Sequence, residues 1–289
     1  MLVAESDSTE GVFTLRFVLV LATFLLFLSG VSGGSPREHA KIVLVAGTAS
    51  HGPGEHEFNA GVTILADCLK KIPGVEPVIA RGNWPADDSV FDGAAAVVLY
   101  LNGGDNHPMT RGNRMERMRG LLAKGVGLAC LHYAVEFQKG PVGEQVLDWL
   151  GGYYETGYST NPHNDVLLTP AEGHAITRGV KPFQLNDEWY YRIRFRPEDR
   201  RVTPVLTAML PKDKPNRETV AWATERQDGG RSFGFTGGHV HKNWGHDGYR
   251  GLVLNAILWV AKQDIPRAGV DSAVTDEQLK ANLDPKPKQ

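Results

Sequence analysis

The sequence predicts an α/β protein with an open, mainly parallel sheet covered by helices. Three observations support this fold class. From residue 41 onward, short apolar runs alternate with amphipathic stretches through short links. The first run, KIVLVAG at 41–47, is apolar at successive positions, as a strand buried on both faces requires. The apolar stretch at 249–263 has the length and pattern of a closing helix.

The elements follow one another in a β-α-β-β-α-β order. A helix is predicted where one stripe collects Val62, Leu65, Ala66, Leu69 and Ile72. Further elements are expected as strands at 76–81 and 94–104, a polar helix at 110–124 and a strand at 126–132. The middle of the chain, 151–225, is less regular. We expect a strand at 202–209 and a hairpin across 219–239 that turns at Asp228-Gly229. Together these elements predict one domain at 40–263.

The two ends differ from this domain. Residues 1–33 contain an apolar run after Arg16 and then small residues, which predicts a secretory signal peptide or an N-terminal anchor. The three acidic residues before the run fit a signal peptide badly. The apolar run nevertheless leads us to expect an exported protein, periplasmic or extracellular. Membrane anchoring by the N-terminus is the alternative to cleavage. Residues 264–289 are polar and are expected to form a mobile tail.

Charge and cysteine content narrow the class of ligand. The formal charge is −2, and removing residues 1–33 takes away three acids and one arginine, which leaves about 0. A neutral or weakly charged ligand is expected, and no basic concentration indicates nucleic acid. The two cysteines, Cys68 and Cys130, fall in a predicted helix and a predicted central strand, so no disulfide framework is expected.

Histidines gather where the predicted strands end. Ligands of a parallel sheet bind at the carboxyl ends of its strands, where the connecting loops meet. In the stretch GLACLHYAVE, 127–136, His132 comes directly after a predicted buried strand. Histidine, acidic and amide side chains also follow the other strands. They are His51, Glu55, His56 and Glu57 after the first strand, Asn102, Asp105 and His107 after the strand at 94–104, and His239, His241 and His246 after the hairpin. The sequence therefore predicts a site at this edge.

Imidazoles in such a cluster suit either proton transfer or ligation of a divalent metal. His132 and Glu136 are spaced four apart, so they would share a face if a helix began after His132. No spacing matches a zinc signature such as HExxH. His107 and His246 are expected to be structural. Cys130 has two interpretations, as a nucleophile activated by a neighbouring histidine or as a small buried hydrophobe.

A second cluster mixes acidic and aromatic residues at 185–195, LNDEWYYRIRF. Aromatic rings stack on sugar faces and carboxylates bind hydroxyls, so this composition suits a carbohydrate. Packing of an edge strand is the other interpretation. Glu188 is a candidate general acid or base, or a metal ligand. A similar stretch at 151–164 carries Glu155 and His163.

Taken together, these motifs resemble the ThuA-like (trehalose utilisation) family over roughly 40–263. The resemblance rests on KIVLVAG…SHGPGEHEFNAG, GVGLACLHYAVE, GGYYE…YSTNP, GHAITRGV, NDEWYYRIRF and GGHVHKNW…YRGLVLNAILW. It implies a flavodoxin-like three-layer α/β sandwich with a mainly parallel central sheet, related to class I glutamine amidotransferases. Those enzymes present a catalytic cysteine at a sharp turn, where this chain matches His132. A shifted alignment would put Cys130 there instead. Glutaminase activity is not expected.

The family context implies action on disaccharides or their 3-keto derivatives by a lyase, isomerase or hydrolase. His132 and Glu188 are then the candidate catalytic residues, and His51, His56 and His239 the candidate ligands of a divalent metal, zinc first. A small carbohydrate is the expected partner, and a homo-oligomer is compatible with the sequence. Two alternatives stay open: a non-catalytic carbohydrate-binding protein and a Cys130-dependent hydrolase. Candidate substrate contacts are Asn102, Asp105, Glu136, Glu155, Trp189 and Tyr190.

Overall fold

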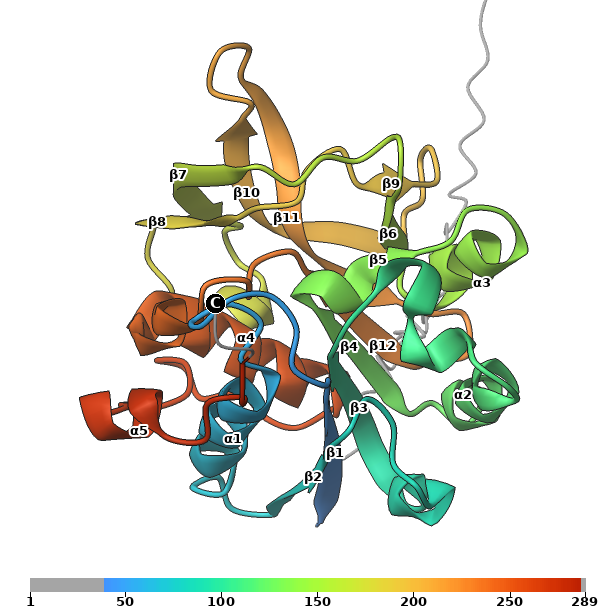
Figure 1. Ribbon diagram of the computed structural model, residues 1–289. Coiled ribbons are helices and arrows are strands. Elements are labelled where there is room, and N and C mark those ends of the chain that lie inside the picture. The colour runs from blue at the N-terminus through green and yellow to red at the C-terminus, as the bar shows by residue number, and fades with distance from the viewer. Residues whose placement is uncertain (1–38, 287–289) are drawn as a thin grey trace, which may run out of the picture. The chain divides into compact units, whose positions relative to one another are not determined.

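The computed structural model describes residues 39–286, which form one mixed sheet of nine strands and a second sheet of three (Figure 1). The strands of the large sheet stand in the order β2-β1-β3-β4-β12-β11-β10-β7-β8. The first five are parallel, which confirms the α/β class and the parallel core. Their bounds are Val75–Ala80 (β2), Ala40–Ala46 (β1), Ala94–Tyr100 (β3), Gly127–Leu131 (β4) and Arg231–Phe235 (β12).

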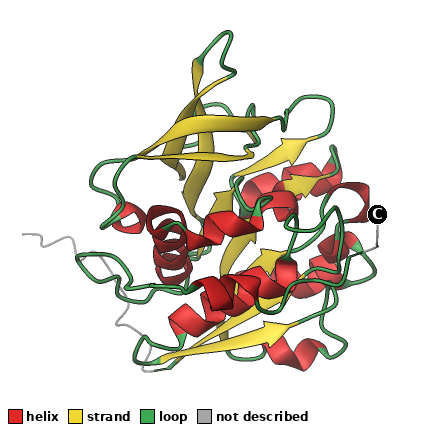
Figure 2. Ribbon diagram, turned by 60° about the vertical axis from the view of Figure 1, so that its left-hand side comes forward, coloured by secondary structure: helices red, strands yellow, loops and turns green. Residues whose placement is uncertain are grey.

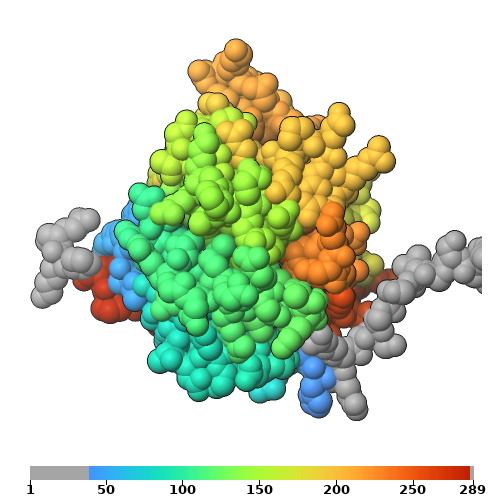
Figure 3. All heavy atoms as spheres, turned by 90° about the vertical axis from the view of Figure 1, so that its right-hand side faces the viewer, coloured from blue at the N-terminus to red at the C-terminus, as the bar shows by residue number. Residues whose placement is uncertain are grey.

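The sheet continues through four antiparallel pairings beyond β12, so it is less parallel than the sequence indicated. These strands are Asn216–Glu225 (β11), Val202–Leu210 (β10), His163–Pro170 (β7) and Phe183–Glu188 (β8). The hairpin at Asp228-Gly229 is confirmed, with Gly229 at φ 77°. The tip at which β10 ends and β11 begins, in orange, projects at the top of Figure 3.

Two apolar cores cover the two faces of the parallel strands. Alternate residues of β1 divide between them: Ile42 and Leu44 enter one core, and Val43 and Val45 the other. The first core includes α1 (Phe58–Leu69) and α4 (Asp247–Val260), and the second includes α2 (Arg114–Leu122) and α3 (Pro141–Trp149). Figure 2 shows the helices in red around the yellow strands. Burial on both faces explains the continuous apolar runs of β1 and β3.

The small sheet joins β5 (Glu136–Phe137), β6 (Gly152–Glu155) and β9 (Arg194–Phe195). It places the residues after His132 beside the 151–164 stretch, because Glu136 pairs with Tyr154 and Phe137 with Glu155. The two polar-aromatic stretches of the sequence are therefore connected through β6 and β9.

Residues 264–286 of the expected tail pack against the domain in this structure. This segment includes α5 (Asp276–Lys280), which begins with a capping box between Thr275 and Gln278, and it buries Asp284 to 5% exposure. Specific polar contacts fix the segment, a kind of interaction that polar composition does not reveal. The predicted signal peptide or anchor lies outside the described residues. Within 39–286, no helix has the length and apolar character needed to cross a bilayer.

Candidate functional site

The loop between β1 and α1 carries the first histidines. His51 and His56 both adopt left-handed backbone conformations, with φ of 63° and 45°. His56 is buried to 1% exposure, whereas His51 is exposed and lies with its ring centroid 3.8 Å from that of His56. The tight path of the loop turns His56 inward and leaves His51 on the solvent side.

His132 occupies the sharp turn at the end of β4, with φ 53° and no exposed surface. The chain then enters a short 3-10 turn, His132–Val135, so the helix expected to align His132 with Glu136 does not form. Gly238 packs against this turn. A Cβ on Gly238 would lie 2.8 Å from the Cβ of His132, so only glycine allows this approach.

Cys130 lies inside β4, two residues before the turn, with 0% exposure. It belongs to the apolar core that contains α2 and α3, and burial raises the pKa of its thiol. A thiol in that environment is an inert hydrophobe rather than a nucleophile. The structure therefore places His132, and not Cys130, at the turn and contradicts the Cys130-dependent hydrolase.

His239 follows β12 and is positioned by a buried carboxylate. Asp187, at 0% exposure, accepts hydrogen bonds from the backbone N–H of Gly238 at 3.0 Å and of Val240 at 3.1 Å. The Tyr249 hydroxyl donates to the same carboxylate at 2.8 Å. Asp187 thus fixes the backbone on both sides of His239. The sequence placed this residue only in a polar-aromatic cluster, and nothing local indicated its role.

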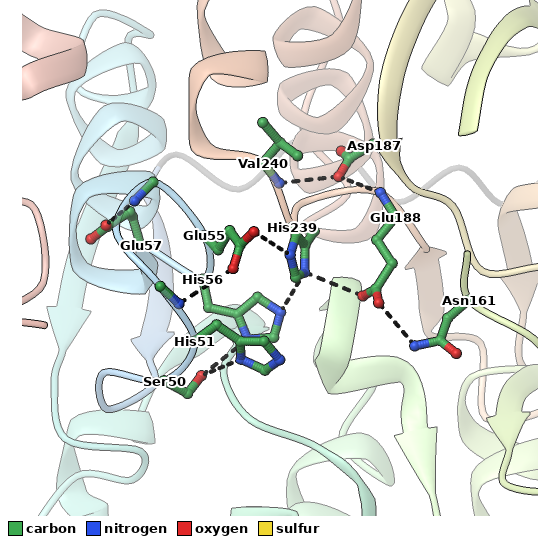
Figure 4. A network of polar contacts seen from close by, with 12 residues as sticks. Ser50, His51, Glu55, His56, Glu57, Asn161, Asp187, Glu188, His239 and Val240 are labelled. Carbon is green, nitrogen blue, oxygen red and sulfur yellow. Dashed lines mark hydrogen bonds and ion pairs between the residues drawn. The ribbon is translucent and has the colours of Figure 1, made fainter. Parts of the chain in front are cut away.

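Four side-chain atoms, from His56, His132, His239 and Glu188, converge at this edge of the sheet. Figure 4 shows three of these residues, His56, His239 and Glu188, pointing toward one another. The Nε2 atom of His56 lies 3.0 Å from Nε2 of His132 and 3.0 Å from Nδ1 of His239. The Oε2 atom of Glu188 lies 3.2 Å from His239 Nδ1 and 3.5 Å from His132 Nε2. Ligands about 2.0–2.1 Å from a tetrahedral zinc ion stand roughly 3.3 Å from one another, so the spacing suits zinc.

The outer nitrogens fix which ring atoms face the centre. His132 Nδ1 lies 2.8 Å from the carbonyl oxygen of Thr236, which only accepts, so Nδ1 carries the hydrogen. His56 Nδ1 lies 3.0 Å from Ser50 Oγ, whose hydroxyl donates to Asn102 Oδ1 at 2.7 Å. Ser50 therefore accepts from His56. In the neutral rings, both Nε2 atoms present lone pairs to the centre.

His239 completes the pattern, because its Nε2 faces Glu55 Oε1 at 3.5 Å and its Nδ1 faces the centre. Each inner nitrogen thus belongs to an imidazole whose other nitrogen has a carbonyl, hydroxyl or carboxylate partner. This arrangement is typical of metal-ligating histidines. Three lone pairs and a carboxylate that face one another are best stabilised by a shared cation.

The electrostatics of the cluster favour a cation as well. Burial, and then the neighbouring imidazoles, lower the pKa of His56, so its ring stays neutral. Burial opposes ionisation of Glu188, but contacts with His132 and His239 outweigh it and lower the pKa of that carboxyl to about 2. Burial lowers the pKa of His239, but the Glu188 carboxylate outweighs this and raises it. The set carries one negative charge when all three rings are neutral.

Solvent reaches the cluster on the side of Glu188, whose side chain is 16% exposed. Asn161 Nδ2 donates to Glu188 Oε1 at 3.0 Å on this side. Tyr133 is half-buried beside the His56 ring, with 5.6 Å between ring centroids. Burial raises the pKa of Glu136, which accepts a hydrogen bond from Thr156 at 2.9 Å. These polar groups surround the cluster with donors and acceptors suited to hydroxyl groups.

Two aromatic residues that were expected to contact substrate are buried. Trp189 is fully buried between Phe235 and Tyr249, so its ring is not available to a sugar, and this expectation is wrong. Tyr190 is also buried, and its hydroxyl lies 3.3 Å from His132 Nε2. Burial of these rings after the end of β8 decides their role, and a run of aromatic residues in the sequence does not reveal it.

Two of the acidic residues also differ from expectation. Glu155 is held by Arg194, at 2.9 and 3.0 Å, and by the Tyr153 hydroxyl at 2.8 Å, which gives it a structural role in the small sheet. Asp105 is exposed and contacts Gln138. Asn102 lies nearer the site, because it accepts from Ser50 and its Nδ2 donates to Thr48 O at 3.0 Å.

His163, the first residue of β7, joins the edge of the site, although the sequence gave it no role. Its ring centroid lies 4.9 Å from that of His239. His163, Glu55 and His239 form a second, more exposed group of nearby ligand atoms. By contrast, His107 stacks on Phe137 and accepts from the Met109 N–H at 3.1 Å, as the structural interpretation predicted.

Comparison with known proteins identifies the family. The family model described as ThuA, trehalose utilisation, matches residues 42–260. The chain belongs to the ThuA family. No curated protein sequence matches it.

Solved structures of ThuA-like proteins share the fold. One from Parabacteroides merdae is 19% identical, with 79% of this chain and 94% of that chain covered at a TM-score of 0.55. One from Bacteroides uniformis is 17% identical, with 78% and 93% covered at 0.56. Agd3, described as a carbohydrate deacetylase, is 11% identical, with 78% of this chain and 32% of that chain covered at 0.50. At these identities the likeness concerns the fold alone.

Proposed function

We propose that this ThuA family member is an exported, metal-dependent enzyme that acts on a carbohydrate. The convergence of His56, His132, His239 and Glu188 carries the proposal, because their donor atoms have the spacing and tautomers of a divalent-metal site. Family membership supports the substrate class, and the apolar N-terminal run supports export. Disaccharides or their 3-keto derivatives are the proposed substrates.

A divalent cation in this site would polarise a carbonyl or hydroxyl oxygen of the sugar. The four ligands of the chain would hold and orient it through atoms fixed by Thr236, Ser50 and Glu55. Asn102, Asn161 and Glu136 supply hydrogen-bonding groups around the solvent-facing side. We propose a lyase, isomerase or hydrolase reaction. A hydrolytic step is compatible with the similar fold of Agd3, which is described as a carbohydrate deacetylase.

The proton acceptor in this scheme differs from the first expectation. His132 and Glu188 direct their free electron pairs to the metal centre, so they are better ligands than bases. His51 lies beside the cluster with part of its surface exposed to solvent. Desolvation of its ring is the larger cause, and the charge of His239 the smaller, of a lowered pKa. His51 therefore stays neutral near pH 7 and can accept a proton from a bound sugar. Burial raises the pKa of Glu136, whose carboxylate accepts a hydrogen bond from Thr156 on the same side of the cluster.

The metal content of the purified protein tests the proposal. Elemental mass spectrometry after exhaustive dialysis should give close to one zinc or other divalent ion per chain, lost in His132→Ala. The matched control is His39→Ala, because His39 is an exposed histidine immediately before β1, at the opposite end of the strand. No bound metal in the wild-type protein, even after incubation with zinc, contradicts the proposal. Turnover of disaccharides and 3-keto derivatives by the loaded protein separates an enzyme from a carbohydrate-binding protein.

A further inference from the structure

The loop that carries His56 has little regular structure to hold it. Residues 47–57 connect β1 to α1 without a strand or helix of their own, apart from a single bridge between Glu55 and Val240. His51 and His56 both adopt the left-handed conformation that side chains disfavour. Such a conformation persists only where the surroundings impose it, so something outside the loop must fix its backbone.

The C-terminal segment supplies part of that restraint, in addition to the backbone hydrogen bond from the His56 N–H to the His239 carbonyl oxygen at 3.0 Å. The Lys286 ammonium donates to the carbonyl oxygens of Ser50 at 2.8 Å, Glu55 at 2.7 Å and His56 at 3.2 Å. It also lies 3.9 Å from Glu57 Oε1, and the Lys286 side chain is only 5% exposed. The three N–H donors of the ammonium are therefore matched by three carbonyls of one loop. The red C-terminal segment reaches the blue loop after β1 in Figure 1.

Neighbouring contacts extend the restraint in both directions. The backbone N–H of Asp284 donates to Glu57 Oε2 at 2.6 Å, and the Asp284 carboxylate accepts from the backbone N–H of Asn59 at 3.2 Å. In α5, Leu279 O accepts from His241 Nε2 at 2.8 Å. The segment thus binds the loop of His56 and the loop that follows His239. The first loop carries the proposed ligand His56, and the second contact, at His241, lies two residues after the proposed ligand His239.

We propose that residues 284–286 at the end of the C-terminal segment hold the metal site in place, and that Lys286 is a positioning residue that sets the backbone of the His56 loop. The inference rests on the proposed metal-dependent function. Lys286 contacts the carbonyl of His56 itself, so its removal frees the backbone from which the buried ligand projects. Partners that orient a metal ligand commonly change metal affinity by 10–100-fold when they are removed.

The test compares Lys286→Met with Lys280→Met, since Lys280 is exposed on α5 and has no contact with the loop. Zinc affinity of the full chain is measured by competition with a chromophoric chelator. A 10–100-fold weaker affinity in Lys286→Met, with Lys280→Met unchanged, supports the inference. Equal affinity in all three proteins overturns it. Lys286→Gln, which keeps two N–H donors, should fall between wild type and Lys286→Met and replaces the latter if that variant does not fold.

Hydrogen exchange of the metal-free protein separates this inference from the proposed function. Amides of residues 50–57 should exchange faster in Lys286→Met than in the wild type, while amides of β3 and β4 stay unchanged. Faster exchange together with no zinc binding by the wild type would uphold the restraint on the loop but contradict the metal site. Unchanged exchange in the loop contradicts the positioning role whatever the metal result.

Discussion

Replacing Glu188 with glutamine tests whether the carboxylate is a ligand of the cluster. Glutamine has nearly the same shape, and its carbonyl oxygen still accepts the hydrogen bond from Asn161 Nδ2. The change removes the one negative charge of the set, which lies 3.2 Å from His239 Nδ1 and 3.5 Å from His132 Nε2. We therefore expect the fold to survive and the affinity for a divalent cation to fall sharply.

The size of the effect follows from binding linkage. At a zinc concentration of about 100 Kd, the wild-type protein gains roughly 2.7 kcal/mol in its free energy of unfolding. Loss of an orienting partner costs 10–100-fold in affinity, and loss of a charged ligand should reach at least the upper value. The variant then gains only about 0.4 kcal/mol at the same zinc concentration. The difference of roughly 2.3 kcal/mol corresponds to about 5–9 °C in Tm for a domain of this size.

Thermal unfolding followed by circular dichroism, with EDTA and then with increasing zinc, measures the difference. His39→Ala is the control and should show the full zinc-dependent rise in Tm. If Glu188→Gln shows the same rise as wild type, the carboxylate is not a ligand and the four-residue site is refuted. If no protein responds to zinc, the titration is repeated with manganese and cobalt before the metal site is abandoned.

Three further predictions concern other residues. His51→Gln should retain metal content but lose most turnover, about 100-fold for a missing general base, and loss of the metal instead would assign His51 to the ligand set. Cys130→Ala should keep metal binding and turnover, and mass spectrometry should find Cys130 unmodified by iodoacetamide in the native protein. Contacts with Arg194 outweigh burial and lower the pKa of Glu155. The ion pair therefore stabilises the fold at pH values above the ordinary glutamate pKa. This stabilisation is lost as the pH falls through the lowered pKa of the folded protein. Glu155→Gln should therefore lose about 1.5–3 kcal/mol at pH 7 in urea unfolding and progressively less as the pH is lowered, and a loss that does not change with pH would exclude the ion pair as the cause.

The parallel half of the sheet was predictable because burial on both faces leaves a continuous apolar pattern. The same pattern located His51, His56, His132 and His239, since residues that follow parallel strands meet at one edge. The antiparallel half was harder to anticipate, because partner choice among strands such as β7 and β10 depends on distant segments.

Side-chain roles within a segment were the least predictable feature. Trp189 and Glu188 are adjacent in sequence, yet one is buried in the core and the other reaches the solvent edge. The order of letters does not decide which neighbour faces which way at the end of a strand. Lys286 was hidden for a different reason: its partners lie some 230 residues away, and its contacts are with backbone carbonyls, which carry no mark in the sequence.

The histidine at the turn after β4 changes what the scaffold can do. A cysteine there would present a nucleophile, but the nearest thiol, Cys130, is enclosed in the core and cannot reach the edge. The Nδ1 hydrogen of His132 is donated to the Thr236 carbonyl oxygen. In the neutral ring, Nε2 therefore carries a lone pair that faces the other candidate ligand atoms. A residue fixed in that way is suited to holding a cation, and an Nε2 lone pair that is shared with a cation is not available to accept a proton. The turn therefore supports binding and polarisation of a substrate, and proton transfer falls to groups such as His51 that keep contact with solvent.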